Sequence, residues 1–417
     1  MGCGACELAC PHQAIAMAVE HNRGVYNAIV DETKCVYCGA CIDVCFGAAI
    51  EHHEPKESLQ RLIQKGRGME VARYGYATDS NLRFRASSGG AVTALLTHLL
   101  DEGHIDAAIV VKLASTDPAL GVSLIAESKE AIQEAMGSKY CPVRISTALK
   151  QMKTGAKYAF VGLPCQIYAT RKLQEKGRLN GEISIYIGLF CGGTLSYHGT
   201  RYILRQNDVE FSNIQAIGYR GFGWPGRFYA ETKDDVISLP FVTYWPNIAR
   251  WFYLDRCLTC LSGLNLNADV SFGDFFSREH ISTDPLGTSV MLVMSGIGAE
   301  ALSSTENAGH LHLKYTSIKK VIESQSSMFL KHRRYPTRLL ILKLLRMGRP
   351  SKGRYESKLG FRIRDALDEL LLHSGRALAS RPGLWPFFDV FKSLMTVYSR
   401  IVMIIGKIIV RNSSLNL

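Results

Sequence analysis

A compact cysteine run near the N-terminus, CVYCGACIDVC, leaves few possible folds for the first part of this chain. Its cysteines are Cys35, Cys38, Cys41 and Cys45. The opening stretch, MGCGACELACP, repeats the last three cysteines of the same C-x2-C-x2-C-x3-C-P pattern. These are Cys3, Cys6 and Cys10. Such a run wraps three thiolates around one iron-sulfur cluster and sends the fourth to a neighbouring cluster, so the repeat predicts two 4Fe-4S clusters.

The pairing of motifs in two-cluster ferredoxins assigns the ligands. One complete cluster is expected on Cys10, Cys35, Cys38 and Cys41. The other is expected on Cys3, Cys6 and Cys45 and lacks one cysteine in this chain. Zinc is the main alternative, but zinc sites prefer two C-x2-C pairs separated by a dozen or more residues. We therefore expect a small two-cluster ferredoxin-type domain over residues 1–54.

The missing ligand has two explanations. Three cysteines could hold a smaller or labile cluster, or the start could be assigned at an internal methionine, with the first cysteine immediately upstream of Met1. We favour the second explanation, because the chain begins in the middle of the motif. Phe46 stands where the second run would normally have proline, which affects only the turn after Cys45.

Composition indicates a globular protein in a reducing compartment. The chain has 417 residues, which is enough for two or three domains. Of these residues 47% are hydrophobic, as is usual for globular proteins with buried cores. No positively charged segment followed by an apolar one precedes the cysteines, so they are interpreted as ligands in the cytoplasm and not as secreted disulfides.

The net charge of +12 belongs to the C-terminal part of the chain. Residues 314–417 contain 21 Lys or Arg and 6 Asp or Glu, and the cations alternate with Leu and Ile, as in RLLILKLLRMGR. A nucleic-acid-binding tail would be a denser basic run, so no nucleic acid is expected. Charged residues interrupt the apolar stretches before they reach the length of about 18 residues that a membrane span needs. A basic helical tail is expected over residues 326–417, packed on the domain or a partner subunit, with a peripheral membrane contact as the alternative.

The region between the two ends alternates between helical and strand patterns. In FRASSGGAVTALLTHLLDEGHIDAAIVV, Val92, Leu95 and Leu99 recur at helical spacing, and a β-branched run follows. YAFVG before PCQIYATRKLQEK and ISIYIGLF before CGGTLSYHG indicate two further strand-turn-helix units. We expect an α/β fold with mostly parallel strands, preceded by a linker with some helix over residues 55–82.

A second set of cysteines lies in this α/β region. Cys165 and Cys191 each come directly after an apolar strand, so a parallel sheet would place both at its carboxyl edge. Cys257 and Cys260, in RCLTC, could complete a four-cysteine site. A zinc site and simple packing of buried thiols are the alternatives. For Cys141, in GSKYCPV, packing is the preferred interpretation.

Six segments, in the order in which they occur, resemble a known family. They are RASSGGAVTALL, GSKY, FVGLPCQ, FCGG, RCLTC and ADVSFGDFF. Over about residues 70–310 the chain resembles the beta subunits of coenzyme F420-reducing hydrogenases and F420H2 dehydrogenases, for which a ferredoxin block is a common companion. Members of this family are iron-sulfur flavoproteins in which FAD, beside a 4Fe-4S cluster, exchanges a hydride with an organic carrier. Bacterial relatives include 7-hydroxymethyl chlorophyll a reductase and divinyl chlorophyllide reductase, so the family does not define the substrate.

The resemblance implies a third 4Fe-4S cluster, close to the flavin, on Cys165, Cys191, Cys257 and Cys260. It also implies that residues 83–150 contact FAD and that residues 151–325 carry this cluster. The residues expected to contact FAD are Ser87, Ser88, Gly89, Gly90, Lys139, Tyr140, Gly162, Pro164, Gln166, Gly273 and Asp274. The Ser-Ser-Gly-Gly turn would offer N–H groups at a helix start to the pyrophosphate, aided by Arg83 or Arg85. An ordinary N-cap is its alternative role, and turn or surface roles are the alternatives for the others.

The expected function follows from the number of electrons that each group carries. A hydride carries two electrons and a 4Fe-4S cluster accepts one, and flavin can divide the pair. The chain is therefore expected to pass electrons between a redox partner protein or subunit and a small-molecule hydride donor or acceptor, such as coenzyme F420. The alternative is a non-catalytic electron-transfer adaptor for a partner enzyme. A zinc-containing nucleic-acid binder is the least favoured alternative.

Overall fold

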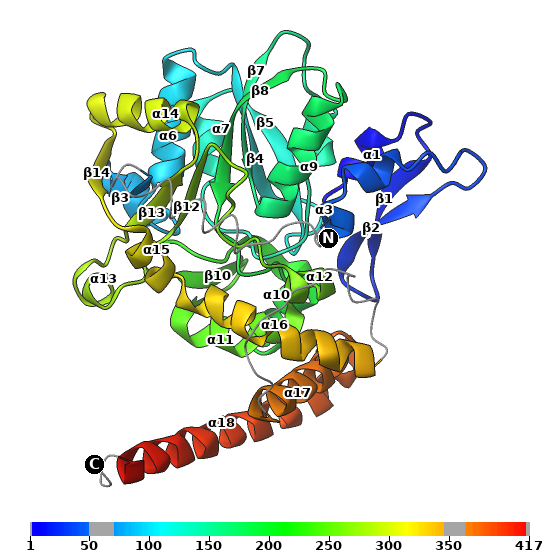
Figure 1. Cartoon of the computed structure of the whole chain (residues 1–417), viewed down its shortest axis with the longest axis vertical. Helices are drawn as coiled ribbons and strands as arrows, with labels where there is room; N and C mark the ends of the chain where they lie inside the picture. The colour runs from blue at the N-terminus through cyan, green and yellow to red at the C-terminus, as the bar shows by residue number, and fades with distance from the viewer. Residues whose placement is uncertain (1, 50–70, 346–362, 414–417) are drawn as a thin grey trace.

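The computed structural model describes residues 2–49, 71–345 and 363–413. Figure 1 shows a central sheet flanked by helices, a small N-terminal unit beside it, and a C-terminal group of long helices. Residues 55–70 of the expected linker, residues 50–54 of the expected ferredoxin-type domain, and residues 346–362 and 414–417 of the expected tail lie outside the described residues. The molecule thus consists of a cysteine-rich unit, an α/β body and a helical C-terminal region.

The body is built on a nine-stranded mixed sheet with the order β14-β3-β13-β12-β8-β7-β4-β5-β6. The four central strands β12, β8, β7 and β4 are mutually parallel. Antiparallel pairs extend the sheet on both sides of them. The expected α/β fold with a parallel core is therefore confirmed. The strands are β3 (Ala72–Ala77), β4 (Ala107–Leu113), β5 (Gly121–Ala126), β6 (Val143–Arg144), β7 (Lys157–Gly162), β8 (Glu182–Leu189), β12 (Val270–Asp274), β13 (Ser289–Val293) and β14 (Leu311–Tyr315).

The sheet begins earlier in the chain than residue 83, where the FAD-contacting domain was expected to start. β3 lies inside the range expected to be a linker, and it pairs with both β13 and β14. Its glycine, Gly75, permits this position, because a Cβ there would come within 2.0 Å of the His312 carbonyl oxygen. The alternation in ARYGYA is short and contains this glycine, which hides the strand in the sequence.

Helices cover both faces of the sheet. α6 and α14 pack their apolar sides on one face, where Leu95 and Leu302 are fully buried. α8 and α9 cover the opposite face, where Phe160 and Ile167 are fully buried. The two faces together form the main core of the body. The helices of this part are α5 (Ser80–Arg85), α6 (Ala91–Asp101), α7 (Lys129–Glu134), α8 (Ser146–Leu149), α9 (Pro164–Glu175), α13 (Arg278–Thr283), α14 (Gly296–Asn307) and α15 (Ile318–Ser324).

A smaller layer lies beyond the carboxyl ends of the parallel strands. It contains a three-stranded antiparallel sheet with the order β11-β10-β9 and three helices, two of which carry aromatic residues. Cys141 is fully buried in the core of this layer, which confirms packing as its role. The elements are α10 (Tyr197–Arg205), β9 (Ile214–Gly218), β10 (Arg227–Thr232), β11 (Val236–Pro240), α11 (Phe241–Phe252) and α12 (Asp255–Thr259).

The N-terminal unit has the internal repeat that the cysteine spacing predicts. Each CGAC segment turns through a glycine in the left-handed region, Gly4 with φ 87° and Gly39 with φ 78°, and a short helix follows. Both positions need glycine, because other residues adopt this conformation only with strain. A hairpin of β1 and β2 joins the two segments. The elements are α1 (Ala5–Ala9), β1 (Ile15–Glu20), β2 (Val25–Val30), α2 (Ala40–Asp43) and α3 (Phe46–Ala49).

The C-terminal region consists of three helices that pack on the small layer. They are α16 (Ser326–Leu344), α17 (Ile363–Ala379) and α18 (Trp385–Ser413). Phe388 of α18 is fully buried between the rings of Tyr202 and Phe252. This packing on the body agrees with the preferred interpretation of the basic tail. Among the described residues, no helix combines the length and apolar character that a membrane crossing requires.

Candidate functional site: cysteine groups and an arginine-centred network

Three adjacent parallel strands end at the same edge of the sheet, and each is followed by a residue of interest. Cys165 follows β7 in the first turn of α9, Cys191 follows β8 after one intervening residue, and Asp274 is the last residue of β12. β7, β8 and β12 are hydrogen-bonded neighbours. Open α/β sheets form their sites at this carboxyl edge, because loops diverge there. The candidate site therefore lies between the main sheet and the smaller layer.

The loop after β8 is tied to the segment that carries the C-x2-C pair. The Cys191 N–H donates to the Gly263 carbonyl at 2.8 Å, and the Leu254 N–H donates to the Thr194 carbonyl at 2.9 Å. The Thr194 N–H in turn donates to the Cys257 Sγ at 3.4 Å. Hydrogen bonds of this kind to cysteine sulfur are among the contacts that set cluster potentials.

The pKa shifts of these thiols are consistent with a shared ligand role. Burial raises the pKa of Cys191 to about 12, and the neighbouring Cys257 and Cys260 add to this shift. Burial also raises the pKa of Cys165 well above its usual range, and the other three cysteines of the group contribute. Thiols whose pKa is raised in this way, such as Cys165 and Cys191, would remain protonated unless a metal centre displaced their protons.

The residue types of this group suit an iron-sulfur cluster. Within residues 2–49, 71–345 and 363–413, no three Cys, His, Asp or Glu side chains are close enough to hold one metal ion. A mononuclear zinc site needs its thiolates around one ion, at about 2.3 Å from it. Four cysteines, one after each of two neighbouring strands and two at the α12 segment, are the type and number of ligands that a 4Fe-4S cluster takes. The residue types present therefore fit such a cluster.

The N-terminal cysteines of the expected incomplete site lie close enough to influence one another. The pKa of Cys6 is raised to about 12, mainly by burial, and Cys3, Cys45 and, to a smaller extent, Cys41 raise it further. Cys10 lies in the other expected group, and its Sγ accepts a hydrogen bond from the Ala14 N–H at 3.3 Å. The complete and incomplete ligand sets both remain predictions, supported by this arrangement.

The N-terminal unit is fastened to the body through Glu7. Its carboxylate accepts hydrogen bonds from Arg144 at 2.9 Å and from Ser146 at 2.8 Å, and it pairs with Lys150 at 2.7 Å. Burial alone would raise the pKa of Glu7, but these hydrogen bonds and cations outweigh it and lower the pKa. The Ile145 N–H also donates to the carbonyl oxygen of Cys3 at 2.8 Å.

This contact brings the incomplete N-terminal group next to the second set of cysteines. α1 packs on α9, and its Ala5 and Ala9 share a buried core with Ile167 of α9. Cys165 lies at the start of α9, and Cys3 contributes to the raised pKa of Cys165. The Cys3, Cys6, Cys45 group is therefore the N-terminal group that faces the body.

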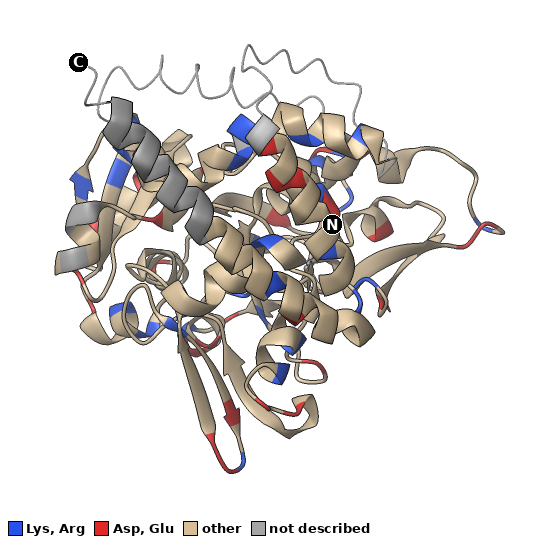
Figure 2. Ribbon diagram, turned by 90° about the horizontal axis from the view of Figure 1, so that it is seen from below, with Lys and Arg blue, Asp and Glu red and all other residues tan. Residues whose placement is uncertain are grey.

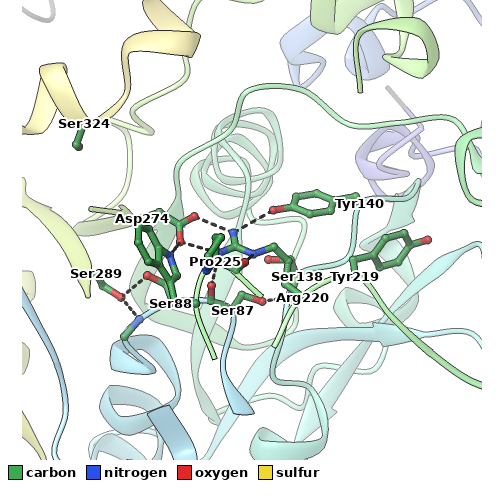
Figure 3. Close-up of polar contacts among 12 residues, drawn as sticks. Ser87, Ser88, Ser138, Tyr140, Tyr219, Arg220, Pro225, Asp274, Ser289 and Ser324 are labelled. Carbon is green, nitrogen blue, oxygen red and sulfur yellow. Dashed lines mark hydrogen bonds and ion pairs between the residues drawn. The ribbon is translucent and has the colours of Figure 1, made fainter. Parts of the chain in front are cut away.

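A second site is organised by Arg220, which lies in the loop between β9 and β10. The guanidinium donates to both carboxylate oxygens of Asp274, at 2.9 and 3.0 Å, and to the Tyr140 hydroxyl at 3.4 Å. It also donates to the carbonyl oxygen of Ser87. Figure 3 shows these groups directed toward the guanidinium from separate segments. Asp274 accepts a further hydrogen bond from the Trp224 indole at 2.8 Å. One buried side chain thus joins three segments that were expected to contact FAD.

The Ser-Ser-Gly-Gly turn lies at the start of α6, as expected. The Ser87 Oγ accepts a hydrogen bond from the Ser138 N–H at 2.7 Å, and the Gly89 N–H donates to the Ser289 Oγ at 3.1 Å. Close packing favours glycine at position 89, because a Cβ there would lie 2.8 Å from the Gly75 carbonyl oxygen. The first N–H groups of α6 itself have no partner within the helix, which leaves donors for an anionic ligand.

The other residues of this turn, and the two arginines that precede it, differ in how available they are to a ligand. Ser88 donates its hydroxyl hydrogen to the Thr288 carbonyl at 3.1 Å, and Gly90, with φ 73°, is the N-cap of α6. Arg83 is held by an ion pair with Asp284 at 2.8 Å, whereas Arg85 is exposed. Arg85 is therefore the better placed of the two arginines for a ligand.

Several of the other expected FAD contacts have structural roles. The Lys139 ammonium caps the end of α7, donating to three backbone carbonyls that include Met136 and Gly137 at 2.9 Å. Burial lowers the pKa of Lys139 to about 8. The Gln166 side chain accepts a hydrogen bond from the Leu163 N–H at 2.8 Å and so caps α9. These contacts hold the loops beside the site.

The other three residues of the expected set lie at strand ends. The Gly162 carbonyl accepts a hydrogen bond from the Asn265 amide at 2.9 Å, and Pro164 opens α9 at its first helical position. Gly273 makes room for the ring of Phe190, which a Cβ would approach to 2.1 Å. All eleven expected positions lie near the carboxyl edge or the α6 start.

Aromatic rings connect the arginine-centred network to the cysteine group. The Tyr140 and Trp245 ring centroids are 4.2 Å apart, and those of Trp245 and Tyr253 are 6.4 Å apart. Gly193, with φ 145°, makes room for Tyr253, because a Cβ would lie 2.8 Å from its ring. Cys191 and Cys257 both contribute to the raised pKa of Tyr253, after burial. The two candidate sites are thus neighbours across one aromatic layer.

Sequence reasoning missed the residues that connect segments. Arg220, Trp224 and Tyr253 lie outside every motif that we singled out. The dense glycine and proline pattern around Arg220, GYRGFGWPG, was the available signal, since it marks a tight loop that brings backbone close to other groups.

Fold and site together define an iron-sulfur protein of the α/β class. Residues 72–150 and 155–319 match the N-terminal and C-terminal parts of the family described as coenzyme F420 hydrogenase/dehydrogenase, beta subunit. Residues 1–49 match a 4Fe-4S dicluster domain. The chain belongs to this family, the beta subunits of coenzyme F420 hydrogenases and dehydrogenases, and is an iron-sulfur member of it.

Relatives with assigned activities match parts of the chain. The coenzyme F420-dependent sulfite reductase of Methanocaldococcus jannaschii is 31% identical over 226 residues, which is 45% of this chain and 35% of that protein. The beta subunit of the coenzyme F420 hydrogenase of Methanothermobacter thermautotrophicus is 25% identical over 253 residues, or 57% of this chain and 82% of that subunit. The chain thus spans about a third of the length of the sulfite reductase.

A solved structure supports the fold. A chain of the F420-reducing [NiFe] hydrogenase complex from Methanosarcina barkeri superposes with a TM-score of 0.53 at 22% identity. The superposition covers 68% of this chain and 96% of that chain. At this level of identity the similarity establishes the shared fold alone.

Proposed function

We propose that this protein is an iron-sulfur flavoprotein that passes electrons between 4Fe-4S clusters and a hydride-exchanging organic partner through FAD. When bound, FAD would take up or release a hydride as an electron pair and exchange the electrons singly with the clusters. Coenzyme F420 is the proposed hydride partner, because the sulfite reductase and the hydrogenase are both named for it.

One observation carries the proposal: the cysteine group and the arginine-centred network follow three adjacent parallel strands. Cys165 and Cys191 follow β7 and β8, and Asp274 ends β12 beside them. Electron exchange between a flavin and a cluster requires the two groups to be close, and neighbouring strand ends supply that closeness.

The chain's own residues would do four things in this scheme. The Cys165, Cys191, Cys257 and Cys260 thiolates would hold the third cluster. Arg220 and Asp274 would keep the Ser-Ser-Gly-Gly turn beside the flavin. Tyr140, Trp245 and Tyr253 would exclude water between the two groups. The N-terminal cysteines would connect the third cluster with a redox partner.

The test is the cofactor content of protein purified without oxygen. We expect about one FAD per chain and eight to twelve irons, as about two to three four-iron clusters require. Replacing Cys165 with alanine should remove about four irons, whereas replacing the packing residue Cys141 with alanine should remove none. Protein that retains its irons but carries no flavin would refute the flavoprotein and leave an electron-transfer adaptor.

The adaptor is the second candidate, and one observation favours it. α18 carries four exposed apolar side chains at helical spacing, and an apolar stripe of this kind suits a partner subunit or an anionic membrane surface. They are Phe387, Val390, Leu394 and Val397. Turnover of a hydride donor by the isolated chain would argue against the adaptor. Full recovery of the chain in the supernatant after sedimentation with anionic vesicles would argue against the membrane.

We propose neither binding to nucleic acid nor secretion. Figure 2 shows Lys and Arg interspersed with Asp and Glu over the described part of the chain, without one continuous basic face in that view. We infer a cytoplasmic location, either free or at the membrane periphery, from the cysteine ligands, which require a reducing compartment.

A further inference from the structure

Cations from the C-terminal helices hold the loop that carries the C-x2-C pair. The Lys331 ammonium, on α16, donates to the carbonyl oxygens of Gly192 at 3.2 Å and Cys257 at 3.0 Å. Arg338, on the same helix, donates to the Leu258 carbonyl at 2.6 Å. Both cations lie beyond residue 319, where the family match ends. The loops that carry the second set of cysteines are therefore contacted by residues outside the matched domains.

Lys331 differs from the other two cations near this loop. Arg338 forms a buried ion pair with Glu369 at 2.7 Å, and Arg376, on α17, pairs with Asp255 at 2.8 Å. Both of these charges are balanced by a carboxylate. Among the described residues, no carboxylate forms an ion pair with Lys331, whose partners are backbone carbonyls. Within that part of the chain, the positive charge of Lys331 at the cysteine group is not balanced by a carboxylate.

The position of Lys331 also gives it a structural role. Gly192 follows Cys191 directly, so the two carbonyls that it contacts belong to the two separate cysteine loops. An ammonium between them fixes the loops relative to each other. Because a one-electron reduction adds one negative charge to a cluster, a nearby cation stabilises the reduced form and raises the reduction potential.

We propose that Lys331 is a positioning residue for the third 4Fe-4S cluster, holding the Cys191 and Cys257 loops together and raising the reduction potential of the cluster. This inference rests on the proposed function for the presence of the cluster. The electron that reduces the cluster comes from the redox partner or from FAD, and no bond to Lys331 forms or breaks.

The test is a redox titration of the full-length, cluster-loaded protein monitored by electron paramagnetic resonance. The signal of the third cluster is identified as the one lost in Cys165→Ala. Three variants are compared with the wild type: Lys331→Gln removes the charge, Lys331→Arg keeps it, and Lys319→Gln removes an exposed charge on α15 that pairs with Glu323 at 3.9 Å.

We expect Lys331→Gln to lower the midpoint potential of the third cluster and the other two variants to leave it near the wild-type value. A three- to tenfold change in the constant for one-electron reduction corresponds to about 30–60 mV, at about 59 mV per tenfold. Loss of this cluster's iron in Lys331→Gln but not in Lys331→Arg would also support the proposal, through the loop contacts.

Two results would overturn the inference. The first is a loaded Lys331→Gln protein with an unchanged midpoint potential. The second is a Lys331→Arg protein that behaves like Lys331→Gln, because packing and not charge would then be responsible. An iron content that Cys165→Ala leaves at the wild-type value would instead refute the third cluster itself, and this failure is distinguishable because it appears before any potential is measured.

Discussion

Replacing Glu369 with leucine is expected to loosen the C-terminal helices, because it leaves Arg338 as an unpaired buried charge. The side chains of Arg338 and Glu369 are 6% and 0% exposed, and two hydrogen bonds of 2.7 and 2.8 Å join them. Removing one partner of such a pair costs about 3–5 kcal/mol. At about 1.4 kcal/mol per tenfold change, this corresponds to a loss of roughly 100- to 4000-fold in local protection.

Native-state amide hydrogen exchange of α16 and α17 measures this loss without requiring the whole protein to unfold in one step. The double variant Arg338→Met/Glu369→Leu should recover much of the protection, since an apolar pair can replace a buried ion pair. Glu323→Leu, at an exposed pair, is the matched control and should change little. Equal loss of protection in the single and double variants, or less than about a tenfold loss in Glu369→Leu, would refute the reasoning.

Three further perturbations test other parts of the structure. Glu7→Gln should lower amide protection in α1 and α8 at neutral pH, while Glu32→Gln should not; in the wild type the same loosening should appear as the pH falls through the lowered pKa of Glu7. Burial raises the pKa of Cys141 from 9.0 to about 12, so the thiol's contribution to stability is complete below pH 9 and is lost above it, by about 1.4 kcal/mol per pH unit. Urea unfolding of Cys141→Ala between pH 9 and 11 should lack that decline, and an equal decline would contradict the assignment. Asp274→Asn should lower flavin absorbance in purified protein without lowering iron content, with Asp235→Asn as the exposed control, and full flavin retention in Asp274→Asn would argue against this site.

Local sequence patterns predicted the features that depend on residues close together in the chain. The C-x2-C repeats indicated the cysteine groups, because ligand loops are short. The strand-turn-helix pattern indicated that Cys165 and Cys191 share a sheet edge, because parallel strands align their carboxyl ends. Each result depends on patterns that lie within one cysteine run or within one strand-turn-helix unit.

The network around Arg220 could not be predicted in this way. Its partners Ser87 and Asp274 are 133 and 54 residues away along the chain, and no local pattern carries such a pairing. The role of Lys139 in holding the end of α7 was hidden in the same way: the motif match suggested a ligand contact, which stays a prediction, and gave no sign that the ammonium donates to backbone carbonyls there. Lys331 lies in a tail that the sequence presents as merely basic.

The shared core of α1 and α9 has a consequence for the rate of electron exchange. Ala5, Ala9 and Val44 are buried among residues of α9, so packing and not a linker sets the separation between the N-terminal unit and Cys165. Electrons would then cross this boundary over a constant distance, without a preceding encounter between two mobile domains. Raising the solvent viscosity should therefore slow electron delivery by an external partner protein but leave transfer across the α1–α9 contact unchanged.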